Sequence, residues 1–132
     1  MIGAMIGEGN GKRTGRRVVS VSPNLVVEVS FEDDSKWLGL DGMNIGTYIS
    51  SPRADGSLQG DGQGAFATMS GELVTWKGVG TGKLENGAVS YAGTLIFNTT
   101  SASLAALNGV AGAFEFSVAA DGTTQSKIWE WK

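Results

Sequence analysis

The chain has 132 residues, of which 41% are hydrophobic and 21 are glycine, and its formal net charge is −3. This length suits one domain with a buried core, expected to span 1–132, and the acidic balance argues against nucleic acid and anionic membranes as partners. The chain has neither cysteine nor histidine, which excludes disulfides, thiolate metal sites and histidine general bases.

Eight β-strands are predicted, separated by turn signals. Pairs of Asp, Asn or Ser with Gly begin at positions 55, 70, 86 and 121, and such pairs suit tight turns because they tolerate a positive φ. Alternating, β-branched and aromatic runs, which are typical of strands, lie between them. These runs predict a bent first strand within 2–21 and further strands at 25–32, 43–51, 57–68, 71–83, 88–98, 109–119 and 123–131.

One helical segment interrupts the strands at 101–107. Ser101 is a residue type that caps helix starts, and Asn108-Gly109 is a pair that ends helices in the left-handed conformation. The consecutive strands read as a series of hairpins. The sequence therefore predicts an all-β antiparallel meander with one short helix near 101–107.

Three Gly-x-Gly-x-Gly triplets place glycine at every second residue, which is the side-chain period of a strand. The triplets are Gly7/Gly9/Gly11, Gly60/Gly62/Gly64 and Gly78/Gly80/Gly82. The second and third share the parity of Phe66 and Trp76, which assigns them to an inward, apolar face. Inward glycines let a small barrel bend tightly, whereas a two-sheet sandwich would need bulky residues there. We therefore predict an eight-stranded antiparallel barrel.

Parity also places the strand carboxylates and the last tryptophans. Glu28 and Glu115, which would need burial to act as an acid or base, fall on outward positions. Trp129 and Trp131 share one face of the last strand, either inside the barrel or at a subunit contact, because tryptophan is enriched at interfaces. Catalytic residues are left unassigned, and a homo-oligomer stays an open alternative.

The charged and glycine-rich motifs have simple interpretations. The glycine triplets lack the spacing of a phosphate-binding loop and lie in strands, so no nucleotide cofactor is expected. The basic cluster from Lys12 to Arg17 is typical of a strand edge that is protected by charge. The acidic run Glu32-Asp33-Asp34, with Asp41 beyond it, lacks the spacing of a calcium loop, and we interpret it as a polar turn without a metal.

Targeting signals are weak in this sequence. Met1–Ile6 is too short for a signal-peptide core, and Arg16-Arg17 is not followed by an adequate apolar run because Pro23 interrupts it. No run approaches the roughly 18 apolar residues of a spanning helix. We expect a bacterial cytoplasmic protein that has no membrane partner.

Four strings resemble those of a known protein family. They are Gly60–Gly64, Trp76–Gly82, Leu104–Phe116 and Lys127–Lys132. Together they resemble a family of small uncharacterised bacterial proteins with the allene oxide cyclase-like barrel. The resemblance spans nearly the whole chain, and its most specific part is Leu107-Asn108-Gly109-Val110. It implies an eight-stranded antiparallel barrel and oligomers, but it brings no reaction and no site residues.

Three functional hypotheses follow from this barrel. The leading one is that the interior binds a small apolar molecule, with Tyr48, Phe66, Trp76 and Tyr91 as the candidate lining residues. The second is a cyclase- or isomerase-like enzyme that uses a Glu or Tyr in the same cavity. The third is a self-associating structural protein with a filled core. An open or a filled interior distinguishes the first two from the third.

Overall fold

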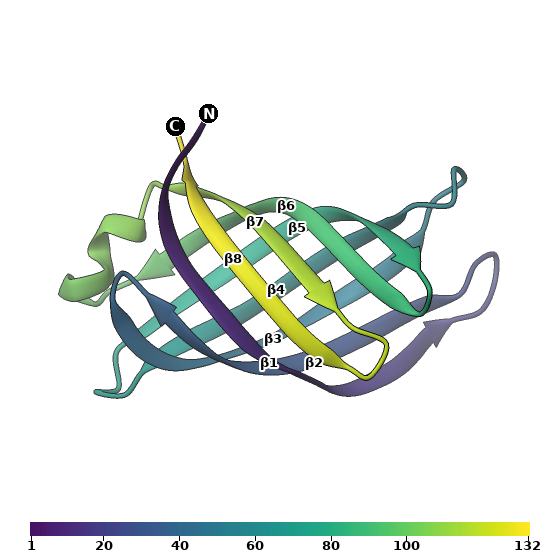
Figure 1. Ribbon diagram of the computed structural model, residues 1–132, viewed down its shortest axis with the longest axis horizontal. Coiled ribbons are helices and arrows are strands. Elements are labelled where there is room, and N and C mark those ends of the chain that lie inside the picture. Colours follow the sequence, from purple (N-terminus) through teal and green to yellow (C-terminus); the bar gives the residue numbers. More distant parts are fainter.

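The computed structural model describes residues 1–132 and forms a closed barrel of eight antiparallel strands in chain order (Figure 1). The elements are β1 (Ile2–Ser20), β2 (Val26–Trp37), β3 (Leu40–Pro52), β4 (Leu58–Thr68), β5 (Leu73–Glu85), β6 (Ala88–Thr99), the 3-10 helix η1 (Ala102–Leu107), β7 (Ala111–Val118) and β8 (Thr123–Trp131). Pairing of β1 with β8 closes the barrel. The predicted fold class is confirmed.

The two ends of the barrel differ. At one end, called here the helix end, lie η1, the turns at 38–39 and 69–72, and both chain termini (Figure 1). At the other, the tyrosine end, lie the loops 21–25, 53–57, 86–87 and 119–122. Leu104 and Leu107 of η1 are buried in the same cluster as Trp37 and Phe66. The helix end is therefore closed by packed side chains.

The helix is found where the sequence predicts it, with different ends. The Ser101 side chain makes no capping hydrogen bond, and Asn108 is extended, while Gly109 has a φ of 82°. Asn108 instead ties the segment to β6: its amide donates to the carbonyl of Thr99 and its side-chain oxygen accepts from the Thr99 N–H, both at 2.9 Å. This pair of bonds holds η1 across the barrel end.

The prediction of a polar turn at Glu32-Asp33-Asp34 is wrong. β2 continues through this run to Trp37, and the turn is Leu38-Gly39, whose φ values are 50° and 80°. The run keeps strict alternation, because Asp33 points inward and is 2% exposed whereas its two neighbours are exposed. The inward residue of this stretch is a carboxylate rather than an apolar side chain, which makes a strand look like a loop.

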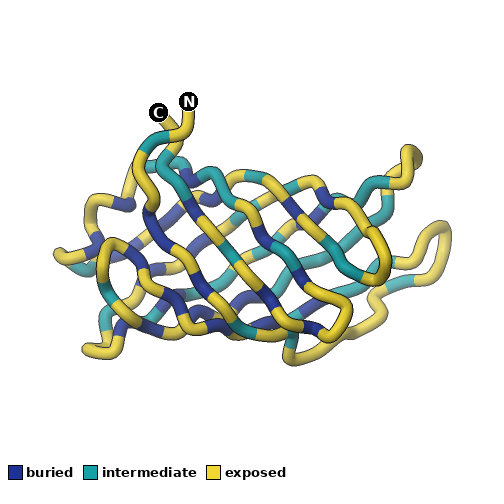
Figure 2. The backbone as a smooth tube through the Cα atoms, viewed as in Figure 1, coloured by how far each residue is buried: buried dark blue, intermediate teal, exposed yellow.

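The predicted inward faces agree with the burial of the strands. Buried and exposed segments alternate along much of the barrel wall (Figure 2). All three glycine triplets face inward, since a side chain at Gly7 would meet Trp37, one at Gly64 would meet Trp76, and one at Gly82 would meet Tyr91. Each glycine leaves room for an aromatic ring on a neighbouring strand.

Gly64 and Gly62 provide a matched test of this close packing. A Cβ at Gly64 would overlap the carbonyl oxygen of Ile45, which is backbone and cannot move aside, whereas one at Gly62 would lie 3.0 Å from its nearest neighbour, Tyr48 Cβ. We expect Gly64→Ala to lower the free energy of unfolding by about 1–3 kcal/mol, and Gly62→Ala to cost less. Urea denaturation of both variants measures the difference, and equal losses would contradict the packing argument.

Candidate ligand-binding cavity

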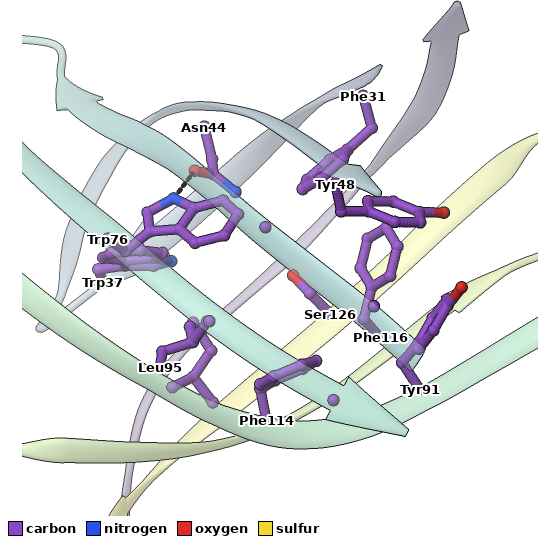
Figure 3. A pocket seen from close by; sticks show the side chains of 15 residues that line it. Phe31, Trp37, Asn44, Tyr48, Trp76, Tyr91, Leu95, Phe114, Phe116 and Ser126 are labelled. Carbon is purple, nitrogen blue, oxygen red and sulfur yellow. Dashed lines mark hydrogen bonds between the residues drawn. The ribbon is translucent and has the colours of Figure 1, made fainter. Parts of the chain in front are cut away.

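A cavity of about 70 Å³ lies inside the barrel (Figure 3). It extends from Trp76, toward the helix end, to Tyr48 and Tyr91, toward the tyrosine end. Nine of its fifteen lining residues are hydrophobic. The lining residues are Phe31, Trp37, Asn44, Tyr48, Gly60, Gly62, Trp76, Gly78, Gly80, Tyr91, Leu95, Phe114, Phe116, Ser126 and Ile128.

The cavity exists because four neighbouring inward positions carry no side chain. Gly60 of β4 pairs with Gly80 of β5, and Gly62 pairs with Gly78. Side chains of neighbouring strands come close to some of these glycines, and Leu95 of β6 fills part of the space over Gly78. The remaining space is the cavity. The two inner glycine triplets therefore remove the side chains that would otherwise fill the middle of the barrel.

Aromatic rings form much of the remaining wall. Phe31 and Phe116 have ring centroids 4.7 Å apart, and Tyr48 packs edge-on against Phe116 at 5.8 Å and against Tyr91 at 5.5 Å. Rigid rings in tilted and edge-on contacts are favourable and hold their positions. This part of the wall is therefore already ordered around the space.

The two tyrosine hydroxyls face away from the cavity. Figure 3 shows both oxygens on the far side of their rings from Trp76 and Asn44. The Tyr91 hydroxyl is 2.9 Å from the Ser50 hydroxyl, with which it forms a hydrogen bond. Burial raises the pKa of both phenols above the ordinary value of 10.0. Neither phenol is placed to move a proton on a molecule in the cavity.

A buried polar chain lies on the Trp76 side. The Trp76 indole N–H donates to Asn44 Oδ1 at 2.9 Å, and Asn44 Nδ2 donates to Asp33 Oδ2 at 3.3 Å. The Ser35 hydroxyl also donates to Asp33. Burial raises the pKa of Asp33, and the bonds from Ser35 and Asn44 oppose that rise only in part. Asn44 lines the cavity but Asp33 does not, so the carboxyl supports the wall without contacting the space.

Three of the four residues predicted to bind a ligand line the cavity. Tyr48, Trp76 and Tyr91 do so, whereas Phe66 does not. Phe66 is fully buried nearer the helix end, where it stacks on Trp37 with ring centroids 4.7 Å apart. Sequence reasoning missed Asn44 and Ser126. Their parity places both inward, but polar residue types gave no sign of an inner wall.

The other candidate groups lie on the outer wall. Glu28 pairs with Arg17 at 3.2 Å, and Glu115 is exposed. Trp131 is 59% exposed and Trp129 is half-buried on the same outward face, so neither lies inside the barrel. Beyond Lys12, β1 has no β8 partner. The Arg13 N–H still donates to the Gly122 carbonyl at 2.8 Å, so only the end of the basic cluster, Arg16 and Arg17, lies on an open strand edge.

The rest of the molecule offers no stronger site. A second, open hollow of about 500 Å³ is lined mostly by residues of β5 to β8, and only three of its thirteen lining residues are hydrophobic. It shares Tyr91, Phe116 and Ser126 with the cavity. No three acidic side chains gather in a way that would hold a metal ion. No helix is long and apolar enough to cross a bilayer.

Comparisons with known proteins identify the fold. No family model and no curated protein matches the sequence. Among solved structures, a conserved protein of unknown function from Rhodopseudomonas palustris has a TM-score of 0.78 at 10% identity, covering 98% of this chain and 97% of that one. A β-barrel-like protein from Acinetobacter baumannii has a TM-score of 0.80 at 11% identity, with coverages of 98% and 94%. The chain shares its fold with uncharacterised bacterial barrels.

One similar structure has a different description. An enzyme from Penicillium herquei matches with a TM-score of 0.67 and 16% identity, covering 96% of this chain and 92% of the enzyme. At such identities the likeness shows a common barrel fold alone. It assigns neither a reaction nor a ligand to this chain.

The burial of Asp33 predicts a distinctive pH dependence of stability. The unfolded chain releases this proton near pH 3.8 and the folded chain releases it at higher pH. Between these values the unfolded state binds fewer protons, so the free energy of unfolding falls as pH rises. We expect Asp33→Asn to lose this fall, as measured by urea denaturation from pH 3.5 to 7.

Asp61→Asn is the matched control, because Asp61 is an exposed strand residue on the outer wall. The unfolding free energy of the wild type minus that of Asp33→Asn should decrease as pH rises. The same difference taken for Asp61→Asn should not show this decrease. A difference for Asp33→Asn that stays constant or grows with pH would show that burial does not raise the pKa of this carboxyl.

Proposed function

We propose that this protein binds a small apolar molecule in the cavity between Trp76 and the pair Tyr48–Tyr91. The observation that carries the proposal is a mainly apolar space of about 70 Å³ within a barrel whose helix end is packed. Eight-stranded barrels have interiors that are either filled by side chains or hold one small ligand. Dry apolar cavities take up apolar molecules of matching size.

The size of the space limits the ligand. A cavity volume of about 10–15 Å³ accommodates one water molecule. The volume of about 70 Å³ therefore has room for roughly five or six non-hydrogen atoms. A long acyl chain does not fit without movement of the wall.

Membership of the allene oxide cyclase-like barrels is supported by the fold and the family resemblance, and it remains part of the proposal.

Binding is better supported than catalysis. A catalytic acid or base has to contact the reacting molecule, and Asp33 stands behind Asn44 while the two phenols point away. Besides the phenols, the polar lining groups are those of Asn44, Ser126, Trp37 and Trp76, none of which exchanges a proton readily near neutral pH. A cyclase- or isomerase-like activity would therefore have to act through shape alone.

Self-association remains compatible with this proposal. Exposed apolar residues on the outer wall include Met43, Ile45, Leu73, Ile96 and Trp131. The cavity argues against a self-associating protein whose core is completely filled, but it does not argue against self-association itself. Native mass spectrometry of freshly purified protein reports the oligomeric state and any retained small molecule together.

Cyclopentane provides a direct test of the proposed function. We expect it to raise the melting temperature, because a ligand at ten times its Kd adds about 1.4 kcal/mol of stability. Gly62→Ala should weaken binding by about tenfold, as expected for an overlap worth about 1–2 kcal/mol, since the new methyl group enters the cavity 3.6 Å from Trp76 Cζ3. Differential scanning calorimetry at several ligand concentrations measures both effects.

Gly15→Ala is the control for an added methyl group. A Cβ at Gly15 has no atom within 4 Å, so this variant should bind cyclopentane like the wild type. A wild-type melting temperature that does not respond to cyclopentane, together with bare protein in native mass spectra, would rule out the proposed function.

A further inference from the structure

We infer that the ligand of this cavity is a neutral molecule with one hydrogen-bond acceptor, which the Ser126 hydroxyl and the Trp37 indole N–H bind. The inference rests on the proposed function and specifies the ligand class. Three polar groups of the lining lack a protein partner. The Tyr48 hydroxyl points away from the cavity, and the other two, the Ser126 hydroxyl and the Trp37 indole N–H, can each donate to a molecule there. Their arrangement, described below, indicates an acceptor such as the oxygen of a ketone, aldehyde or ether.

The Trp37 indole nitrogen is a buried donor without an acceptor. Trp37 is 1% exposed, and its Nε1 atom makes no hydrogen bond. Only one other buried side-chain polar atom in the structure lacks a partner, Thr124 Oγ1, and Thr124 does not line the cavity. Buried polar groups are nearly always satisfied, and leaving one unsatisfied costs free energy. An acceptor in the cavity would remove this cost.

Trp76 shows what the satisfied state looks like in the same cavity. Its indole N–H donates to Asn44 Oδ1 at 2.9 Å. The Asn44 amide nitrogen in turn donates to Asp33. The protein therefore supplies an acceptor for one of the two lining indoles and none for the other.

Ser126 lies on the same wall as the Trp37 ring. Its hydroxyl forms no hydrogen bond within the protein, and Figure 3 shows the oxygen directed into the space between Trp76 and Phe116. Ser126 pairs with Gly9 of β1, and the Trp37 ring lies against Gly7, two residues away on the same face. The glycine stripe of β1 thus brings the hydroxyl and the indole to one side of the cavity.

The lining also excludes a charged ligand. No charged side chain of either sign lines the cavity, so an anionic or a cationic ligand would be buried without a counter-charge, which is strongly unfavourable. A ligand that only donates hydrogen bonds would leave Trp37 unsatisfied. A compact neutral carbonyl compound or ether fits both the donors and the apolar wall.

The test uses two probes of the same shape, cyclopentanone and methylenecyclopentane, which differ only in the acceptor oxygen. Ser126→Ala should weaken binding of the ketone by about fivefold, as expected for one lost hydrogen bond, and leave binding of the alkene unchanged. Ser90→Ala, on the exposed outer wall, should change neither. Ratios between variants are compared, because the two probes differ in their hydration.

The indole ¹H–¹⁵N NMR signal of Trp37 reports hydrogen bonding of its N–H in the wild-type chain. The signals of Trp76, Trp129 and Trp131 are assigned with single Trp→Phe variants, which leaves Trp37 intact. The ketone should move the Trp37 N–H signal downfield by more than the alkene does. The Trp76 signal is the internal reference, because its N–H is already bonded to Asn44.

The outcomes separate this inference from the proposed function. Equal effects of Ser126→Ala on both probes, or equal movement of the Trp37 signal with both, would overturn the acceptor inference while leaving apolar binding in place. Failure of both probes to bind the wild type would overturn the proposed function, and the inference with it.

Discussion

The structure depends on one steric constraint: the inner wall of this barrel cannot carry a side chain at every inward position. Where one strand contributes a large ring, its neighbour contributes a glycine, as for Trp37 over Gly7 and Tyr91 over Gly82. The rings form the core and the glycines let the wall curve around them. Four adjacent glycines of β4 and β5 leave more space than the surrounding side chains fill, and this unfilled space is the cavity.

This constraint also determines what the interior can do chemically. The space is bounded mainly by rings and bare backbone, and the one buried carboxyl, Asp33, lies behind Asn44. Asn44 accepts from Trp76 on one side and donates to Asp33 on the other, so it holds this polar wall in place. Shape and one or two hydrogen bonds are the means of recognition that remain, which is why binding is favoured over proton transfer.

Much of the fold could be predicted from the sequence because the turns and the alternation are local signals. The Asx-Gly turns and the parity of the glycine triplets placed the strands and their inward faces. The same method failed at Asp33, because a carboxyl at an inward position breaks the apolar pattern while the backbone continues as a strand. Spacing alone does not show that Asn44 and Ser126 line a cavity, or that the Trp37 N–H has no acceptor. These features depend on contacts between strands that are far apart in sequence.

Closure of the barrel between β1 and β8 has a consequence for synthesis on the ribosome. β1 is made first among the strands of this barrel and its β8 partner last, and the Lys132 N–H donates to the Met1 carbonyl at 2.6 Å. Such distant pairing makes folding slow, and the edge of β1 stays unpaired until β8 has been made. The glycines and arginines of β1 make this unpaired edge a poor template for aggregation.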